Sequence, residues 1–309
     1  MGYTNQRMAY GKTLVELGRE NRNIVVLDAD LSASTMGKLF EAEFPERHFE
    51  MSIAEANMIS VAAGLAQTGK IPFAGSFAVF AAGRAFDQIR QAVSIGKLNV
   101  KICGSSAGLS DFGDGATHQS LEDLAIMRAI PNMTVLCPAD ANEMVKAVRA
   151  AAAFDGPCYI RANRNDYENV SAEDDPFEIG CPSVLREGTD VVVFAIGYMN
   201  NLALAAAEEL KDSVSVKVVN MSTLKPVNEA YLHSLAEGAK GIVTVEEHSV
   251  IGGLGSTISG VFSRDRIPVE MVGVNDTFGC SARDYPSLLA HFGLTKEHIM
   301  QAIRAAAAE

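Results

Sequence analysis

Residues 23–30 read NIVVLDAD, a β-branched run typical of a strand that is buried on both faces of a sheet. Similar runs follow as VKIC (100–103), MTVLC (133–137) and CYIRA (158–162). Alanine-rich stretches with helical spacing lie between them: AEANMISVAAGLAQTG (54–69), AFDQIRQAVSIG (85–96) and ANEMVKAVRAAAAF (141–154). This alternation predicts an α/β domain that ends near residue 165.

An acidic segment, DYENVSAEDDPFE (166–178), separates this pattern from a second one. It contains a proline and has no apolar periodicity, so it is interpreted as a connector. Strand-like and helix-like runs then resume: DVVVFAIG (190–197), NLALAAAEELK (201–211), VSVKVVNM (214–221), GIVTVEEH (241–248) and IPVEMVGV (267–274). We expect two α/β domains, residues 1–170 and 180–309, each with a mainly parallel sheet flanked by helices.

Composition narrows the class of partner. Of the 309 residues 48% are hydrophobic and 21% charged, the profile of a soluble globular protein. The formal net charge is −12 and the basic residues are dispersed, so we expect neither nucleic acid nor a membrane as partner. An anionic substrate would need a local basic pocket.

Cysteine usage and the N-terminal sequence predict a cytoplasmic protein. The number of cysteines is odd, no C-x-x-C pair occurs, and most lie in apolar runs, which indicates buried free thiols: Cys103, Cys137, Cys158, Cys181 and Cys280. The first ten residues, MGYTNQRMAY, lack the apolar core of a signal peptide, and no apolar run approaches a membrane span.

Two apolar stretches carry candidate site residues. Glu55 is nearly the only charge in SIAEANMISVAAGLA (52–66), so it is a candidate for proton chemistry, although an acid at a helix start also favours the helix dipole. In GSFAVFAAGRAFDQIRQAV (75–93), phenylalanines follow a Gly-Ser entry at spacings of three and six. Such rings either pack in the core or stack on a flat heterocycle.

A third stretch, SSAGLSDFGDGATHQSLEDLAIM (105–127), is a long polar loop after the VKIC strand. It offers Asp111, Asp114 and His118 at the edge of a parallel sheet where ligands bind. A histidine and an aspartate four residues apart could instead satisfy one another. No zinc spacing, P-loop or G-x-S-x-G elbow occurs, and IGGLGSTISG (251–260) departs from the dinucleotide pattern, so we assign no metal ligands.

Taken together, five segments resemble the transketolase family in order and approximate spacing: SIAEANM, SFAVFAAGRAFDQI, DGATHQSLEDLAIMRAIPNM, DGPCYIRANR and VTVEEHSVIGGLGS. The resemblance covers nearly the whole chain and is nearest to transketolases and 1-deoxyxylulose-5-phosphate synthases. It implies a pyrimidine-binding domain followed by a transketolase C-terminal domain, with thiamine diphosphate as cofactor.

The resemblance also implies roles around the cofactor. Glu55 matches the catalytic glutamate that bonds the pyrimidine ring nitrogen and so lets the exocyclic amine take the thiazolium proton. Phe77 and Phe80 match aromatic residues that lie against the pyrimidine. Gly83 stands where many relatives have a third aromatic, which leaves this wall less complete. Asp30 matches an acid near the cofactor.

Further matches concern the substrate. His118, the second expected catalytic residue, and Asp114 match residues that contact substrate hydroxyls near the bond that breaks. Arg7, Ser34 and Arg164 match residues that hold a sugar phosphate, which suits the local basic pocket required by an acidic protein.

One family motif has no counterpart in the sequence. The GDG that is followed by NN, which holds the diphosphate and magnesium, belongs to an N-terminal domain, whereas GDG at 113–115 lies in the DG-x-THQ loop. The resemblance therefore implies a separate N-terminal transketolase subunit that binds magnesium, and a dimer of this chain in an α2β2 assembly.

The function that follows is the C-terminal subunit of a split transketolase, which transfers a two-carbon ketol unit from a ketose phosphate to an aldose. Two alternatives remain open: the β subunit of a 2-oxo-acid dehydrogenase E1 component, and a non-catalytic assembly subunit. The donor and acceptor sugars are not determined by the sequence.

Overall fold

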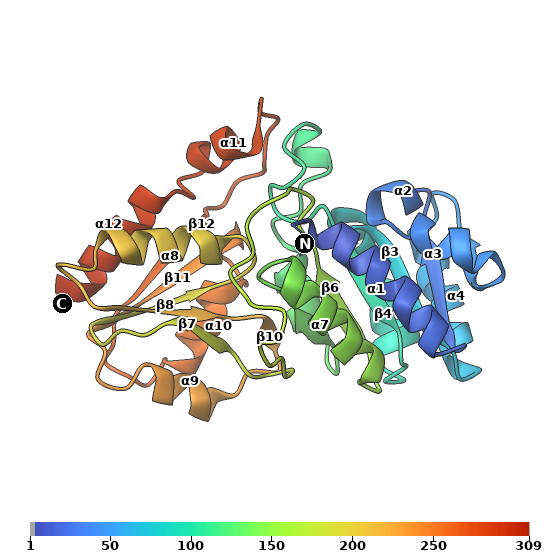
Figure 1. Ribbon diagram of the computed structural model, residues 1–309, viewed down its shortest axis with the longest axis horizontal. Coiled ribbons are helices and arrows are strands. Elements are labelled where there is room, and N and C mark those ends of the chain that lie inside the picture. Colours follow the sequence, from blue (N-terminus) through green and yellow to red (C-terminus); the bar gives the residue numbers. More distant parts are fainter. Residues whose placement is uncertain (1–3, 309) are drawn as a thin grey trace.

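The computed structural model describes residues 4–308 as two α/β units that lie side by side (Figure 1). The first contains a seven-stranded sheet of order β10-β5-β6-β4-β3-β1-β2, and the second a five-stranded sheet of order β12-β11-β8-β9-β7. Every pair in the first sheet is parallel except β10 with β5, and every pair in the second except β7 with β9. The predicted fold class is confirmed.

The first unit follows the predicted order and adds elements that the sequence did not predict. Its strands are β1 (Ile24–Asp28), β2 (His48–Glu50), β3 (Ile71–Phe77), β4 (Lys101–Ser105), β5 (Thr134–Leu136) and β6 (Cys158–Arg161). Its helices are α1 (Gln6–Glu20), α2 (Ser32–Thr35), α3 (Lys38–Glu43), α4 (Glu55–Gln67), α5 (Phe86–Gln88), α6 (Asp123–Ala129) and α7 (Ala141–Ala153). Short 3-10 turns cover Pro45–Arg47 and Gly115–Thr117.

The predicted helix over 85–96 differs from what the structure shows. Only Phe86–Gln88 is α-helical, and it lies between two π-helical segments, Val79–Arg84 and Ile89–Ser94. A π-helix has more residues per turn than an α-helix, so different side chains share one face of the helix. The segment after β3 therefore presents its residues differently from a regular helix, and π-helical turns occur frequently at functional sites.

The second unit contains β7 (Ser183–Arg186), β8 (Val191–Ala195), β9 (Val216–Asn220), β11 (Gly241–Ser249) and β12 (Val269–Val274). Its helices are α8 (Met199–Glu209), α9 (Glu229–Leu235), α10 (Leu254–Val261), α11 (Tyr285–His291) and α12 (Lys296–Ala308). Alternate residues of β8 face opposite layers, since Val191 and Val193 join the cluster of α8 and α12, whereas Val192 and Phe194 join that of α9 and α10.

The strand β10 (Thr223–Lys225) lies in the C-terminal half of the chain but belongs to the first sheet. It pairs antiparallel with β5, where Thr223 lies opposite Leu136. Its three residues show no strand periodicity, so the sequence did not predict it. Pairing there covers an edge of the sheet and joins the two units.

A buried polar network also joins the units. Arg161, at the end of β6, donates to both carboxylate oxygens of Asp123 and to the carbonyl of Glu247 at 2.9 Å. The Glu247 carboxylate accepts from the Leu109 amide at 2.7 Å and from the Tyr285 hydroxyl at 2.6 Å. Burial raises the pKa of Glu247 to about 7, although the Arg161 charge opposes this shift.

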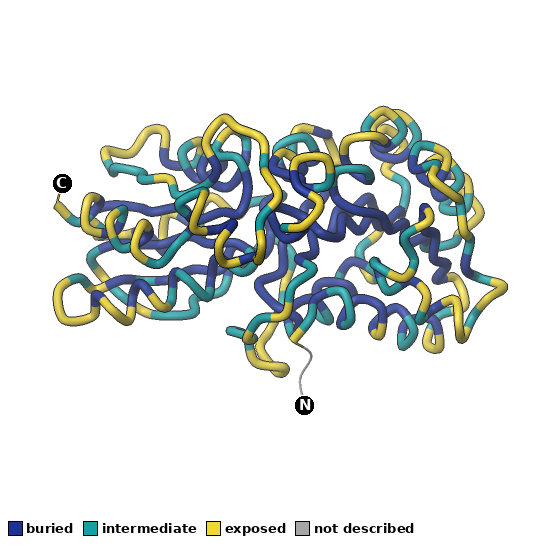
Figure 2. The backbone as a smooth tube through the Cα atoms, turned by 90° about the horizontal axis from the view of Figure 1, so that it is seen from above, coloured by how far each residue is buried: buried dark blue, intermediate teal, exposed yellow. Residues whose placement is uncertain are grey.

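The central strands of both units are buried, whereas the edge strands β7 and β12 are mostly half-buried (Figure 2). All five cysteines are free; three are buried, as predicted, whereas Cys181 is half-buried and Cys280 exposed. Among residues 4–308, no helix combines the length and apolar character that crossing a bilayer requires.

Candidate functional site

The predicted site residues gather at one edge of the first sheet, where its parallel strands end. Segments that follow five different strands supply them: Asp30 and Ser34 after β1, Glu55 after β2, Phe77 and Phe80 at and after β3, Asp114 and His118 after β4, and Arg164 after β6. Arg7 comes from the start of α1. This edge is where open α/β sheets bind ligands.

Glu55 is the first residue of α4, and its side chain is buried, with 1% exposed. No side chain caps this helix, and the N–H groups of a helix start favour negative charge, so this position suits the Glu55 carboxylate. Arg84 Nη1 donates to both Glu55 oxygens at 3.0 Å. A buried carboxylate here thus has one cationic partner, which the sequence did not identify.

An aromatic wall stands beside this acid. The rings of Phe77 and Phe80 are stacked, with centroids 6.1 Å apart and planes 15° from parallel. His118 presents its ring edge-on to both, at 6.1 Å from Phe77 and 5.4 Å from Phe80. A Cβ added at Gly83 would meet no heavy atom within 4 Å, so open space lies beside this position. The structure thus brings Phe77, Phe80 and His118 together.

The loop that carries His118 runs between β4 and α6. His118 Nδ1 bonds the Thr117 hydroxyl at 2.9 Å rather than Asp114. The alternative in which Asp114 and His118 satisfy one another is therefore not what the structure shows. Asp114 is exposed and His118 half-buried. Both side chains remain accessible to a ligand.

Two arginines meet nearby. The Asn5 side chain caps α1 by accepting from the Arg7 amide at 3.0 Å, and it donates to the Arg164 carbonyl at 3.1 Å. The pKa of Arg7 is lowered by burial and, secondarily, by the charge of Arg164. Arg164 pairs with Asp111, and its Cζ lies 5.8 Å from the Phe77 ring centroid. The start of α1 and the segment after β6 thus bring two guanidinium groups near each other, with Asp111 paired to one of them.

Ser34 contacts this arginine pair through its backbone, because Arg7 Nη1 donates to the Ser34 carbonyl at 3.1 Å. Asp30 is less closely connected. It is exposed, has a left-handed φ of 59°, and its amide donates to Glu50 Oε1 at 2.8 Å. In the described part of the chain no contact joins Asp30 to the Glu55 and phenylalanine cluster.

The second unit holds the His118 loop in place. Gln119 Nε2 donates to the carbonyls of Asp111 at 3.0 Å and Cys280 at 2.9 Å. Gly115 has a φ of 75°, and a Cβ there would lie 2.5 Å from Ser281 Oγ, so the close approach requires glycine. The sequence did not assign a role to Gln119, and only its place in DGATHQ could have indicated one.

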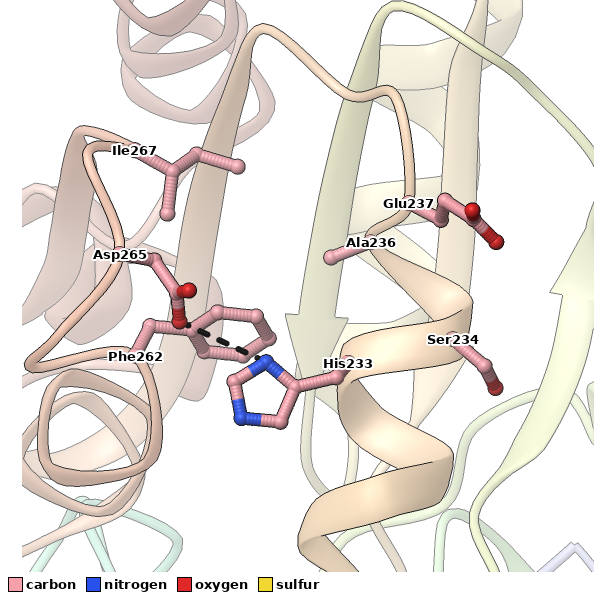
Figure 3. Close-up of a pocket in the computed structure, with 7 residues that line it drawn as sticks. All are labelled: His233, Ser234, Ala236, Glu237, Phe262, Asp265 and Ile267. Atoms are coloured by element: carbon pink, nitrogen blue, oxygen red, sulfur yellow. Dashed lines mark ion pairs between the residues drawn. The ribbon is translucent and has the colours of Figure 1, made fainter.

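Two hollows lie on the molecule, one beside the His118 loop and one on the second unit. One of about 550 Å³ lies beside the His118 loop and is lined by residues of both units, including Gln119, Leu121 and Phe278. The other, of about 400 Å³, lies on the second unit at α9 and the loop before β12 (Figure 3). There His233 Nδ1 lies 3.4 Å from Asp265 Oδ2, and its ring centroid lies 4.7 Å from that of Phe262. This second hollow contains none of the predicted site residues.

Comparisons with known proteins give the family. Residues 3–169 match the family described as "Transketolase, pyrimidine binding domain", and residues 182–299 match "Transketolase, C-terminal domain". The chain belongs to the transketolase family, as the resemblance predicted.

Individual relatives agree with this assignment. The chain is 45% identical over 306 residues to a "Putative transketolase C-terminal section" of Methanocaldococcus jannaschii, covering 97% of this chain and 96% of the relative. It is 38% identical to the transketolase of Mus musculus, covering 96% of this chain but 48% of that protein. A solved structure described as "Split gene transketolase, inactive beta4 tetramer" matches with 48% identity and a TM-score of 0.90, covering 99% of both chains.

Proposed function

We propose that this chain is the C-terminal subunit of a two-chain transketolase, which transfers a two-carbon ketol unit from a ketose phosphate to an aldose. The observation that carries the proposal is the buried Glu55 carboxylate beside the stacked Phe77 and Phe80 rings. A flat heterocycle with a basic ring nitrogen fits an acid and an aromatic face arranged in this way.

Thiamine diphosphate, when bound, supplies the nucleophilic carbon that carries the two-carbon unit. With the cofactor bound, Glu55 would hold a proton at the pyrimidine ring nitrogen, and Phe77 and Phe80 would lie against the ring. Burial of Glu55 at the α4 start would strengthen this hydrogen bond, because electrostatic contacts are stronger away from water. For Asp30, which is exposed after β1, a role near the cofactor rests on the family resemblance alone.

His118 and Asp114 bind the substrate hydroxyls nearest the bond that breaks. His118 is positioned for this by its contact with Thr117 and by the rings of Phe77 and Phe80. It holds or moves a proton at a substrate oxygen, which is the task expected of an imidazole in this place.

The basic pocket binds the sugar phosphate. Burial and, secondarily, the nearby charge of Arg164 lower the pKa of Arg7, so a negatively charged ligand between the two arginines would be favoured. A phosphate brings that negative charge into a protein of net charge −12, and the Ser34 hydroxyl completes the set. Binding one end of the sugar fixes the position of its carbonyl.

A partner chain is part of the proposal. Residues 4–308 contain no group of three or more histidine, cysteine or acidic side chains that could hold a metal. In this proposal an N-terminal transketolase subunit would bind the magnesium and the diphosphate, as the family resemblance implies. The descriptions of two relatives, a transketolase "C-terminal section" and a split gene transketolase whose β4 tetramer is inactive, support such a partner.

We also propose the assembly, the cellular location and the domain bounds that the sequence predicts. The assembly is α2β2, the protein is cytoplasmic, and the domains are residues 1–170 and 180–309. Of the alternatives, an E1 β-type subunit would act on an apolar oxo acid, for which Asp114 and two arginines are poorly suited. A non-catalytic assembly subunit would have no need for a buried Glu55.

Copurification tests this function. The chain is isolated with its bound partner, and the complex is assayed with a panel of ketose phosphates, thiamine diphosphate and magnesium. Ketol transfer that requires both chains and the cofactor is the expected result. Decarboxylation of 2-oxo acids by the complex would establish the E1 alternative, and a complex without either activity would favour the assembly role.

A further inference from the structure

The guanidinium of Arg84 lies where two proposed cofactor contacts converge. Its Nη1 is 3.0 Å from each oxygen of Glu55, and its Cζ is 4.6 Å from the centroid of the Phe80 ring. One of these partners is assigned to the pyrimidine nitrogen and the other to the pyrimidine face. A single flat cation therefore makes both contacts that the ring would make.

We propose that the Arg84 guanidinium is a stand-in for the aminopyrimidine ring and must leave Glu55 and Phe80 before thiamine diphosphate binds. This inference rests on the proposed function. A guanidinium and an aminopyrimidine protonated on its ring nitrogen are both flat, both present N–H donors to a carboxylate, and both stack on an aromatic face. Arg84 and the cofactor therefore compete for the same acid and the same ring.

Burial explains why a stand-in is required. The Glu55 carboxylate is 1% exposed, and a charge removed from water without a partner is strongly unfavourable. The helix start compensates only a part of that charge. Arg84 supplies the rest until a pyrimidine nitrogen replaces it as the donor.

The position of Arg84 also allows it to move away. It is the last residue of the π-helical segment Val79–Arg84, and its side chain is 51% exposed. The preceding residue, Gly83, has open space around it. Phe77 and Phe80, in contrast, stack on each other and contact His118. The arginine can turn outward while the aromatic wall stays in place.

Thiamine is the probe, because it carries the pyrimidine without the diphosphate that the partner chain is expected to hold. The full chain is labelled with ¹³C at glutamate Cδ, and the Glu55 resonance, assigned by its loss in Glu55→Gln, is followed during titration. Arg84→Ala removes the stand-in, and Arg84→Lys keeps the charge but not the flat fork. Arg90→Ala is the matched control, because Arg90 is exposed in the next π-helical segment.

We expect the Kd of thiamine to fall about fivefold in Arg84→Ala, the upper range for a partly exposed ion pair, and to stay unchanged in Arg90→Ala. Arg84→Lys should lie between the two. Added guanidinium ion, compared with sodium chloride at the same ionic strength, should restore the wild-type Kd to Arg84→Ala by filling the vacated position.

Each other outcome overturns the inference in a distinguishable way. If thiamine shifts the Glu55 resonance but its Kd is unchanged or higher in Arg84→Ala, Arg84 is no stand-in, and the cofactor site remains. If neither thiamine with the full chain nor thiamine diphosphate with the paired enzyme shifts the Glu55 resonance in any variant, the proposed pyrimidine site fails as well. Circular dichroism checks the fold; should Arg84→Ala not fold, an unchanged Kd in folded Arg84→Lys overturns the inference instead.

Discussion

Replacement of Arg164 by alanine is the direct test of the phosphate pocket. Arg164 is partly buried, with 30% of its side chain exposed, and a charge-assisted contact in such a place contributes about 1.5–3 kcal/mol. That range corresponds to a rise of about 10- to 150-fold in the KM for phosphorylated substrates. Since Arg164 already pairs with Asp111, which a phosphate must partly replace, we expect the lower end, about tenfold.

The assay compares two substrates in the reconstituted two-chain enzyme. Steady-state kinetics are measured with a ketose phosphate and with the same ketose without its phosphate. The KM for the first should rise in Arg164→Ala, while the second changes much less, because it never made the contact. Arg186→Ala is the matched control: its side chain is 28% exposed and pairs with Glu208 in the second unit.

Loss of Arg164 also leaves Asp111, which is 3% exposed, without its cation. Lower stability alone would reduce activity on both substrates. The double variant Arg164→Ala/Asp111→Asn removes the uncompensated carboxylate and should retain the discrimination between the two substrates. Equal losses on both substrates in the single and the double variant would refute phosphate binding by Arg164.

Four further predictions concern the acid, the loop, the interface and the partner. Glu55→Gln should leave the fold intact but slow exchange of the cofactor C2 proton, followed by NMR in the paired enzyme; an unchanged rate would remove Glu55 from the mechanism. Gln119→Ala should lower kcat while leaving the Tm nearly unchanged, because the His118 loop loses its bonds to Asp111 and Cys280. A lower Tm with an unchanged kcat would contradict this. Burial raises the folded-state pKa of Glu247 from 4.5 to about 7, so its stabilising contribution is complete below about pH 4.5 and is lost as the pH rises through 7. Urea unfolding between pH 5 and 8 should therefore show a smaller decline for Glu247→Gln than for the wild type. Calorimetry should show weak binding of thiamine diphosphate and magnesium to the isolated chain, whereas tight stoichiometric binding would overturn the split-subunit proposal.

Most elements of the fold could be predicted because each is encoded locally. β-branched runs such as NIVVLDAD are strands in the structure, and the alanine-rich stretch at 141–154 is a helix over 141–153. The exceptions have physical causes. The residues of β10 are too few to show a period, and their strand exists only because the edge of β5 accepts it. The π-helical turns at 79–84 are likewise invisible in a pattern that also suits an α-helix.

The candidate site also has a part that is encoded locally and a part that is not. Glu55, Phe77, Phe80 and His118 could be proposed as site residues because they belong to motifs in which neighbours in sequence stay together. Their mutual contacts, the approach of Arg7 to Arg164, and the pairing of Arg84 with Glu55 join residues that are far apart in the chain. Gln119 was also missed, since its partner Cys280 lies in the other unit.

The sequence by itself determined the class of fold and the family, and it predicted which residues bind a thiamine pyrimidine, because periodicity and short motifs are local properties of a chain. Only the tertiary structure decided which of those residues meet. The order of strands in the first sheet brings five strand ends to one edge, and the packing of the second unit fixes the loop between β4 and α6. Contact between distant residues depends on how sheets and units assemble, and burial of Glu55 makes a cationic partner necessary without saying that it is Arg84.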